Sequence, residues 1–147
     1  MRIENHEAIE LDKVFADVEI ETPYLEKILK KVLFIINGAM DIFSNGFGPI
    51  HEGRIFGNEG VVTETGDIYL DSKKLQKHDE DVAMAIIAHE LAHYHLGHYK
   101  KTGRDSENQK EADDLAKQWG FNIDKMREIF RLRGIQNSWL GERMTQR

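Results

Sequence analysis

Cysteine is absent from this chain of 147 residues, and proline occurs only twice. Without cysteine there are no disulfide bonds and no thiolate metal sites, so a bound metal ion must rest on His, Asp or Glu side chains. Long apolar runs are also missing: a run such as Val32 to Ile36 is far shorter than the roughly 20 residues that cross a bilayer. We therefore expect no membrane span in this sequence.

Strongly basic stretches are equally scarce. The formal net charge is −6, and the basic clusters at Lys100-Lys101 and Arg131 to Arg133 are short. A nucleic-acid-binding or anionic-membrane surface is therefore not expected. Residues Met1 to Glu7 lack the apolar segment of a signal peptide, which favours a cytoplasmic location.

The length fits one domain that covers residues 1–147. Hydrophobic residues make up 40% and charged residues 31% of the chain, as is usual for a globular protein. Residues 1–20 show no clean period and predict an N-terminal arm that packs on the body. Residues 135–147 predict an irregular tail, and the oligomeric state stays open.

Periodicity predicts an α+β fold, mostly helical, with a small antiparallel sheet. Apolar residues at three- and four-residue spacing predict a helix from Thr22-Pro23 to about Phe43. Short β-like segments follow at 54–56, 60–63 and 67–70, the last two joined by a turn. Further helices are expected over 79–98, from a capping box at Ser106 and Gln109 to Gly120, and from Asn122 to about Gly134.

The most informative segment is His89-Glu90-Leu91-Ala92-His93, an H-E-x-x-H sequence within the helix expected over 79–98. Residues four apart lie on one helical face, so the two imidazoles can converge on one metal ion. Glu90 lies about 100° further round the helix, where its carboxylate can accept a proton from water beside the metal. The segment predicts a zinc hydrolase with His89 and His93 as ligands and Glu90 as catalytic base, although the pattern also occurs by chance.

A catalytic zinc ion needs a third protein ligand. The helix from Ser106 offers Glu107, Glu111, Asp113 and Asp114. On a continuous helix His98 would lie about 140° from His93, which indicates a surface or capping residue. The expected sheet has an edge that can pair with an extended chain, so the expected partner is a peptide or protein substrate.

Residues 57–130 resemble the core of the gluzincin zinc peptidases, specifically the HtpX and CAAX prenyl protease family and the minigluzincins. The resemblance is carried by Gly66 to Leu70, by the H-E-x-x-H helix with Gly97-His98, and by Gln109 to Ala116 followed by Gly120-Phe121. It implies a zinc metallopeptidase of gluzincin type. It also implies that Asp113 orients a ligating histidine and that Asn58 contributes to substrate binding.

The chain departs from this family at the third zinc ligand, because Gln109 stands where the family has a glutamate. Glu111 is predicted to be the ligand instead, through a local shift of the helix, with Gln109, Glu107 and Asp113 as alternatives. The departure also supports a hypothesis from another class. In that hypothesis the chain is a metallopeptidase-like pseudoenzyme that acts as a binding or regulatory module.

Two further expectations concern the groups around the reaction. The developing oxyanion needs a hydrogen-bond donor besides the metal, and Tyr94, Tyr99, His78 and Arg104 are the candidates. The tail with Trp139 and Leu140 is expected to cover the cleft if the enzyme is latent.

Overall fold

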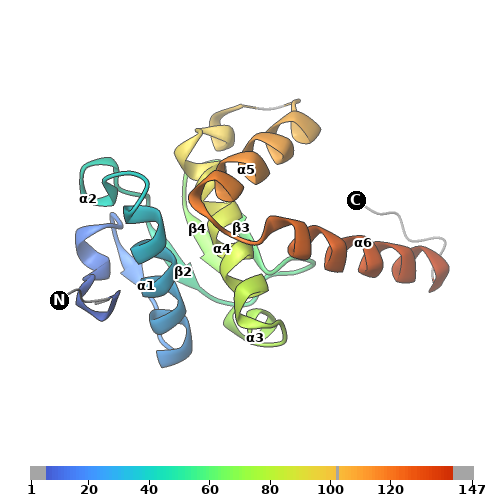
Figure 1. Ribbon diagram of the computed structural model, residues 1–147, viewed down its shortest axis with the longest axis horizontal. Coiled ribbons are helices and arrows are strands. Elements are labelled where there is room, and N and C mark those ends of the chain that lie inside the picture. Colours follow the sequence, from blue (N-terminus) through green and yellow to red (C-terminus); the bar gives the residue numbers. More distant parts are fainter. Residues whose placement is uncertain (1–5, 102, 141–147) are drawn as a thin grey trace.

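The protein was analysed as a computed structural model that describes residues 6–101 and 103–140, the last six of these as backbone only (Figure 1). The elements are η1 (His6–Ala8), η2 (Leu11–Lys13), β1 (Val18–Glu19), α1 (Pro23–Asn37), α2 (Ile42–Asn45), β2 (Ile50–Glu52), β3 (Gly60–Val62), β4 (Ile68–Leu70), α3 (Ser72–Leu75), α4 (Glu80–His95), η3 (His98–Lys100), α5 (Asp105–Trp119) and α6 (Ile123–Leu140). The predicted α+β fold is confirmed.

The four strands form one mixed sheet in the order β1-β2-β4-β3. The antiparallel pair β3–β4 agrees with the prediction, whereas β1–β2 and β2–β4 are parallel. The strand predicted over 54–56 is wrong: the strand lies at Ile50–Glu52, where Ile50 is fully buried, while Phe56 is fully exposed. Since β3 ends the strand order, its outer edge has no strand beside it in the part of the chain described here.

The N-terminal arm packs on the body as predicted, over the described residues 6–20. It buries Ile9, Leu11, Val14 and Phe15, and it supplies strand β1. The helix expected from Thr22 to Phe43 begins as predicted, with the Thr22 hydroxyl accepting from the Leu25 amide. It ends early at Asn37, because the chain turns after Gly38 and restarts as α2 with Asp41 as its cap.

Helix α4 runs through the centre of the molecule and contacts α1, α5, α6, β3 and β4 (Figure 1). Most of its side chains from Val82 to Ala92 are buried, and the alanines among them allow neighbouring elements to approach closely. The predicted helix over 79–98 is correct to His95. There the chain turns through Gly97, which has a φ of 73°, and continues as η3.

Helices α5 and α6 flank α4 on the side that carries the H-E-x-x-H segment. The capping box predicted at Ser106 and Gln109 is wrong, because α5 begins at Asp105 with Arg104 at its cap position and no side-chain cap. Helix α6 continues to Leu140 and does not stop near Gly134. Its backbone points away from the body in Figure 1, while the side chains of Trp139 and Leu140 lie outside the described part.

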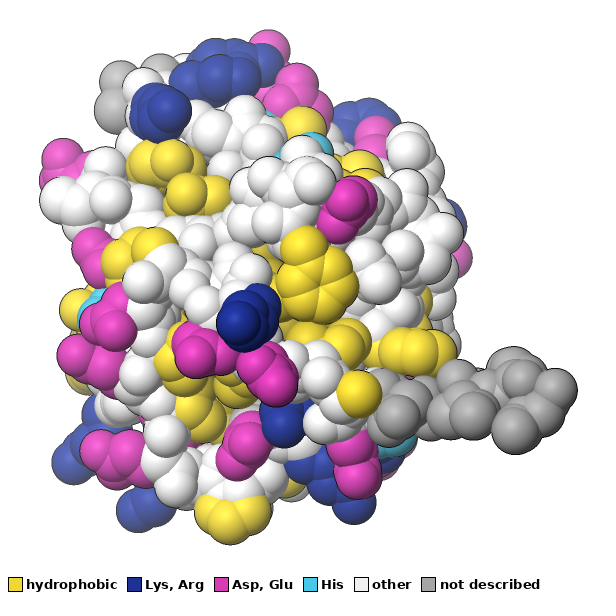
Figure 2. Space-filling model, turned by 90° about the vertical axis from the view of Figure 1, so that its left-hand side faces the viewer, with side chains coloured by type: hydrophobic (Ala, Val, Ile, Leu, Met, Phe, Trp, Pro, Cys, Tyr) yellow, Lys and Arg dark blue, Asp and Glu magenta, His cyan; other side chains and the backbone are white. Residues whose placement is uncertain are grey.

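One face of the molecule carries a mixture of side-chain types, without a large patch of one charge. Figure 2 shows acidic, basic and hydrophobic side chains interspersed on the face that carries the N-terminal arm. Among the helices over residues 6–101 and 103–140, none has the length and apolar character of a membrane span.

Candidate metal centre and active site

The two histidines of the H-E-x-x-H segment converge as their spacing predicts. The Nε2 atom of His93 lies 3.0 Å from the Nε2 atom of His89, with the two ring centroids 4.4 Å apart. The His89 side chain is buried. Burial of the His93 ring, together with the neighbouring His89 and His98, lowers the pKa of His93 to about 3. His93 is therefore neutral at physiological pH, which is the form that binds a metal ion.

Asp113 of α5 lies behind His89. Its Oδ1 atom is 2.8 Å from His89 Nδ1, a distance typical of a charge-assisted contact. The N–H direction of the His89 ring is not aligned with this oxygen atom. Arg127 of α6 holds the same carboxylate with two bonds of 2.7 and 2.8 Å. Burial raises the pKa of Asp113, but the adjacent His89 and Arg127 outweigh it and bring the pKa down to about 2.

Because an ionised carboxylate only accepts hydrogen bonds, Asp113 favours the proton of neutral His89 on Nδ1. The Nε2 atom of His89 then presents its lone pair towards His93. A carboxylate that accepts from the other ring nitrogen is a common means by which proteins orient a metal-binding imidazole. Asp113 thus lies where it can hold the His89 ring with Nε2 towards His93.

Glu90 points from α4 towards strand β3. A Cβ atom at position 60 would stand 2.9 Å from Glu90 Cγ, so only glycine at this position allows the strand to pass so closely. Protein atoms surround the carboxyl group, yet it reaches solvent through the adjacent cleft. Burial raises the pKa of Glu90, and the neighbouring His89 and Arg127 partly oppose this rise.

Among the candidates for the third ligand, the structure places Gln109 and Glu111 in different surroundings. Gln109 lines the same cleft as Glu90 and His93. Glu111 instead accepts from His98 at 2.8 Å and from Arg104 at 3.3 Å, with its side chain 46% exposed. The alternative Glu107 bonds with Arg104. Of the predicted site residues, His89, His93 and Glu90 are brought together, and Glu111 is not with them.

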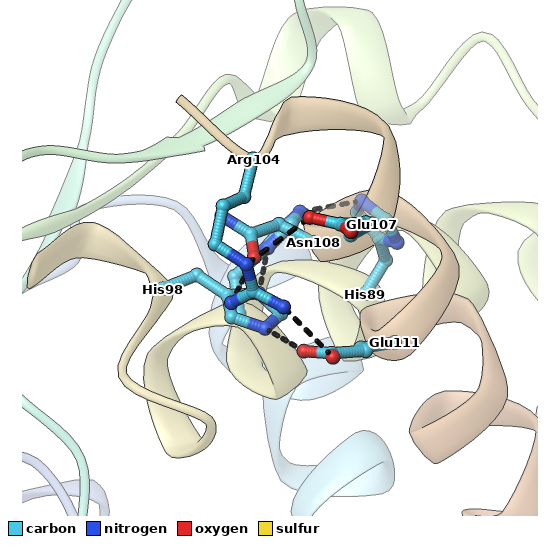
Figure 3. A network of polar contacts seen from close by, with 7 residues as sticks. His89, His98, Arg104, Glu107, Asn108 and Glu111 are labelled. Carbon is cyan, nitrogen blue, oxygen red and sulfur yellow. Dashed lines mark hydrogen bonds and ion pairs between the residues drawn. The ribbon is translucent and has the colours of Figure 1, made fainter. Parts of the chain in front are cut away.

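His98 is a site residue that sequence reasoning missed. It is buried, and its Nδ1 atom lies 2.9 Å from His93 Nδ1. Figure 3 shows His98, after α4, meeting Glu111 from α5, with Arg104 beside them. The signal in the sequence was Gly97, because a glycine at this point ends a helix and turns the following side chain back.

A groove runs past Glu90 on both sides. One hollow lies towards α5 and is lined by Val61, Tyr99 and Lys101, and the other lies towards α6 and is lined by Arg127, Phe130 and Arg133. Four residues line both hollows: Asn58, Gly60, Glu90 and Gln109. The two hollows therefore form one path along β3, and Asn58 lies on it.

A buried carboxylate fixes the start of β3 beside this groove. Glu59 is 5% exposed and accepts from Arg133 of α6 at 2.7 Å, while His78 lies 2.9 Å from the same oxygen. Burial raises the pKa of Glu59, but the bonds with Arg133 and His78 outweigh it and lower the pKa. This contact holds the strand and α6 on either side of the groove.

Comparisons with known protein families, with curated proteins and with solved structures find no match for this chain. Within residues 6–101 and 103–140, no group of three His, Asp or Glu side chains converges as metal ligands. Gln109 lines both hollows, together with His93 in one and with His89 in the other.

Proposed function

We propose that this chain is a zinc-dependent peptidase in which His89 and His93 bind the metal ion and Glu90 carries the proton. The observation that supports this most strongly is the 3.0 Å approach of the two Nε2 atoms. Two neutral imidazoles whose lone pairs face each other repel unless a cation or a shared proton lies between them. Asp113 on the far side of His89 supports the same orientation.

Gln109 is the group best placed to complete the ligand set, through its amide oxygen. An amide oxygen is neutral and binds zinc more weakly than a carboxylate, so the proposed site has a lower affinity than one with three charged or imidazole ligands. When bound, zinc would supply a Lewis acid that polarises the scissile carbonyl and lowers the pKa of water.

The remaining steps fall to residues of the chain. Glu90, whose pKa is raised by burial, is suited to accept a proton from water and to deliver it to the leaving amine. Tyr99 is the one oxyanion-donor candidate that lines the hollow with Glu90 and His93, and its ring stacks on that of Tyr94. A peptide substrate would pair with the outer edge of β3 and run along the groove.

The substitution Glu90→Gln tests the proposal. It keeps the shape of the side chain and removes its basicity, so we expect zinc content by metal mass spectrometry to be unchanged. Hydrolysis of a peptide library should fall on the order of 10²- to 10⁴-fold. The matched control is Glu107→Gln, which changes an exposed carboxylate of α5 in the same way. Equal hydrolysis by Glu90→Gln and wild type would remove Glu90 from the mechanism.

The second candidate is the pseudoenzyme, a binding or regulatory module, and the observation that favours it is Gln109 in place of a carboxylate. The variant Gln109→Glu separates the two. If the wild-type chain binds zinc through this site, the added carboxylate should raise zinc affinity several-fold or more. If neither protein binds zinc, the peptidase proposal is wrong and the binding module takes its place.

A further inference from the structure

A continuous chain of polar contacts leads from His93 to the surface of α5. His93 Nδ1 lies 2.9 Å from His98 Nδ1, and His98 Nε2 lies 2.8 Å from Glu111 Oε1. Arg104 donates to the other oxygen of Glu111 at 3.3 Å (Figure 3). His98 is 5% exposed, so these contacts to its ring are shielded from water.

The direction of each hydrogen bond in this chain follows from its far end. The Glu111 carboxylate can only accept, so the Nε2 atom of His98 carries a proton and donates it. In neutral His98 the Nδ1 atom is then an acceptor, and His93 must donate to it from its own Nδ1. The Nε2 atom of His93 is left with a lone pair, facing His89.

We propose that His98 and Glu111 are positioning residues that hold His93 in the tautomer and ring orientation required for metal binding. The inference rests on the proposed function and deepens it, because it assigns a role to two side chains outside the ligand set. The contact between His98 and His93 would then play the part for His93 that the Asp113 contact plays for His89. Each imidazole of the pair would then be oriented through its Nδ1 atom from a carboxylate of α5, directly in one case and through His98 in the other.

The fold supplies both members of the pair from independent elements. Gly97 turns the chain after α4 and returns His98 towards His93, one turn beyond the motif. Glu111 lies on a regular stretch of α5, about 200° round the helix from Gln109 and from Asp113. Arg104, at the start of the same helix, fixes the Glu111 carboxylate on the side of His98.

The first test reads the tautomers directly. In the full-length protein, labelled with ¹⁵N in histidine and freed of zinc with a chelator, long-range ¹H–¹⁵N spectra distinguish a protonated Nδ1 from a protonated Nε2. We expect His93 to be protonated on Nδ1 and His98 on Nε2. A doubly protonated His98, or His93 protonated on Nε2, would overturn the proposal. This readout needs neither zinc binding nor hydrolysis, so it is independent of the outcome for the proposed function.

The second test compares two substitutions of Glu111. Glu111→Gln keeps an acceptor oxygen for His98 and should leave the tautomers unchanged, with zinc affinity within about threefold of wild type. Glu111→Met removes the acceptor and should produce mixed tautomers and a loss of zinc affinity of roughly 10- to 100-fold. Glu107→Met is the control, because Glu107 bonds with the same arginine but not with His98. Equal, large losses of zinc in both Glu111 variants would overturn the proposal, since that is the behaviour of a direct ligand.

A third comparison uses His98 itself. In His98→Asn the amide oxygen can take the place of Nδ1 as acceptor, whereas His98→Leu has no acceptor. We expect the asparagine variant to retain zinc affinity well above that of the leucine variant. Equal affinities would show that His98 acts only by filling space, which contradicts the positioning role.

Discussion

Strand β3 passes so close to α4 that a Cβ atom on Gly60 would stand 2.9 Å from the Cγ atom of Glu90. Real Cβ contacts are longer, so any side chain at position 60 must push either the strand or the glutamate away. The position of the proposed proton carrier is thus tied to the absence of a side chain on the edge strand.

The substitution Gly60→Ala should therefore misplace Glu90 without touching the two histidines. We expect hydrolysis to fall roughly 10- to 100-fold, because displacements of about 1 Å in an active site have effects of that size. Zinc content should be retained. Gly53→Ala is the control, since a Cβ atom there would meet open space. Undiminished hydrolysis by Gly60→Ala would mean that this contact relaxes at no cost to Glu90.

Removal of the Asp113 carboxylate should weaken the proposed metal site through His89. For Asp113→Ala we expect a loss of zinc affinity of roughly 10- to 100-fold, measured by competition with a chelating dye. Asp114→Ala is the matched control on the next residue, where the carboxylate pairs with Lys110 on the surface. Similar zinc affinities in the two variants would rule out the orienting role of Asp113.

Loss of the Arg133 guanidinium should destabilise the whole fold, since it leaves the buried Glu59 carboxylate with a hydrogen-bond partner missing. We expect Arg133→Met to reduce the free energy of unfolding by about 1–3 kcal/mol in urea titrations. Arg131→Met is the control, because Arg131 pairs with Glu128 on the exposed face of the same helix. A smaller effect for Arg133→Met than for the control would indicate that water replaces the guanidinium.

The parallel strands are linked by a pH-dependent contact at His51. Its Nδ1 and Nε2 atoms lie 2.6 and 3.0 Å from Glu19 and Asp67. Burial lowers the pKa of His51, but the bonds with Asp67 and Glu19 outweigh it and raise the pKa above its ordinary value. The resulting stabilisation is complete below about pH 6.5, while the carboxylates are ionised, and is lost as the pH rises through the raised pKa of the folded protein.

The variant His51→Gln should accordingly lose more stability relative to wild type at pH 5.5 than at pH 8.5, in urea unfolding at the two pH values. His95→Gln, on a histidine that packs against Trp119, serves as the comparison. If the two pH values give the same difference for His51→Gln, the histidine contributes through its packing on Tyr69 and not through its charge.

The part of the site that depends on spacing within one helix was predictable from the sequence. His89, Glu90 and His93 are fixed relative to one another by helical geometry alone. The third ligand of the proposed site could not be predicted in this way, because its identity depends on where α5 starts. A capping box at Ser106 would have used the Gln109 side chain to cap the helix. In the structure α5 begins at Asp105, Gln109 lines the cleft with His93, and Glu111 contacts His98.

His98 was misplaced for a related reason. Its predicted position came from extending α4 past His95, although Gly97 interrupts the helix and reverses the direction of the next side chain. The strand at Ile50–Glu52 was missed because its partners are remote in sequence: Ile50 pairs with Val18 on one side and Ile68 on the other. Local patterns carry little information about such pairings.

The packing of α4 against α1, α5, α6, β3 and β4 has a consequence for hydrogen exchange. Amides of a helix buried in the core open to solvent only when the whole domain unfolds, so those of His89 to His93 should exchange among the slowest in the chain. This protection should persist after chelation, because packing and not metal keeps the helix ordered. Zinc would then bind to histidines that are already in place, unlike a zinc finger, whose fold forms only with its metal.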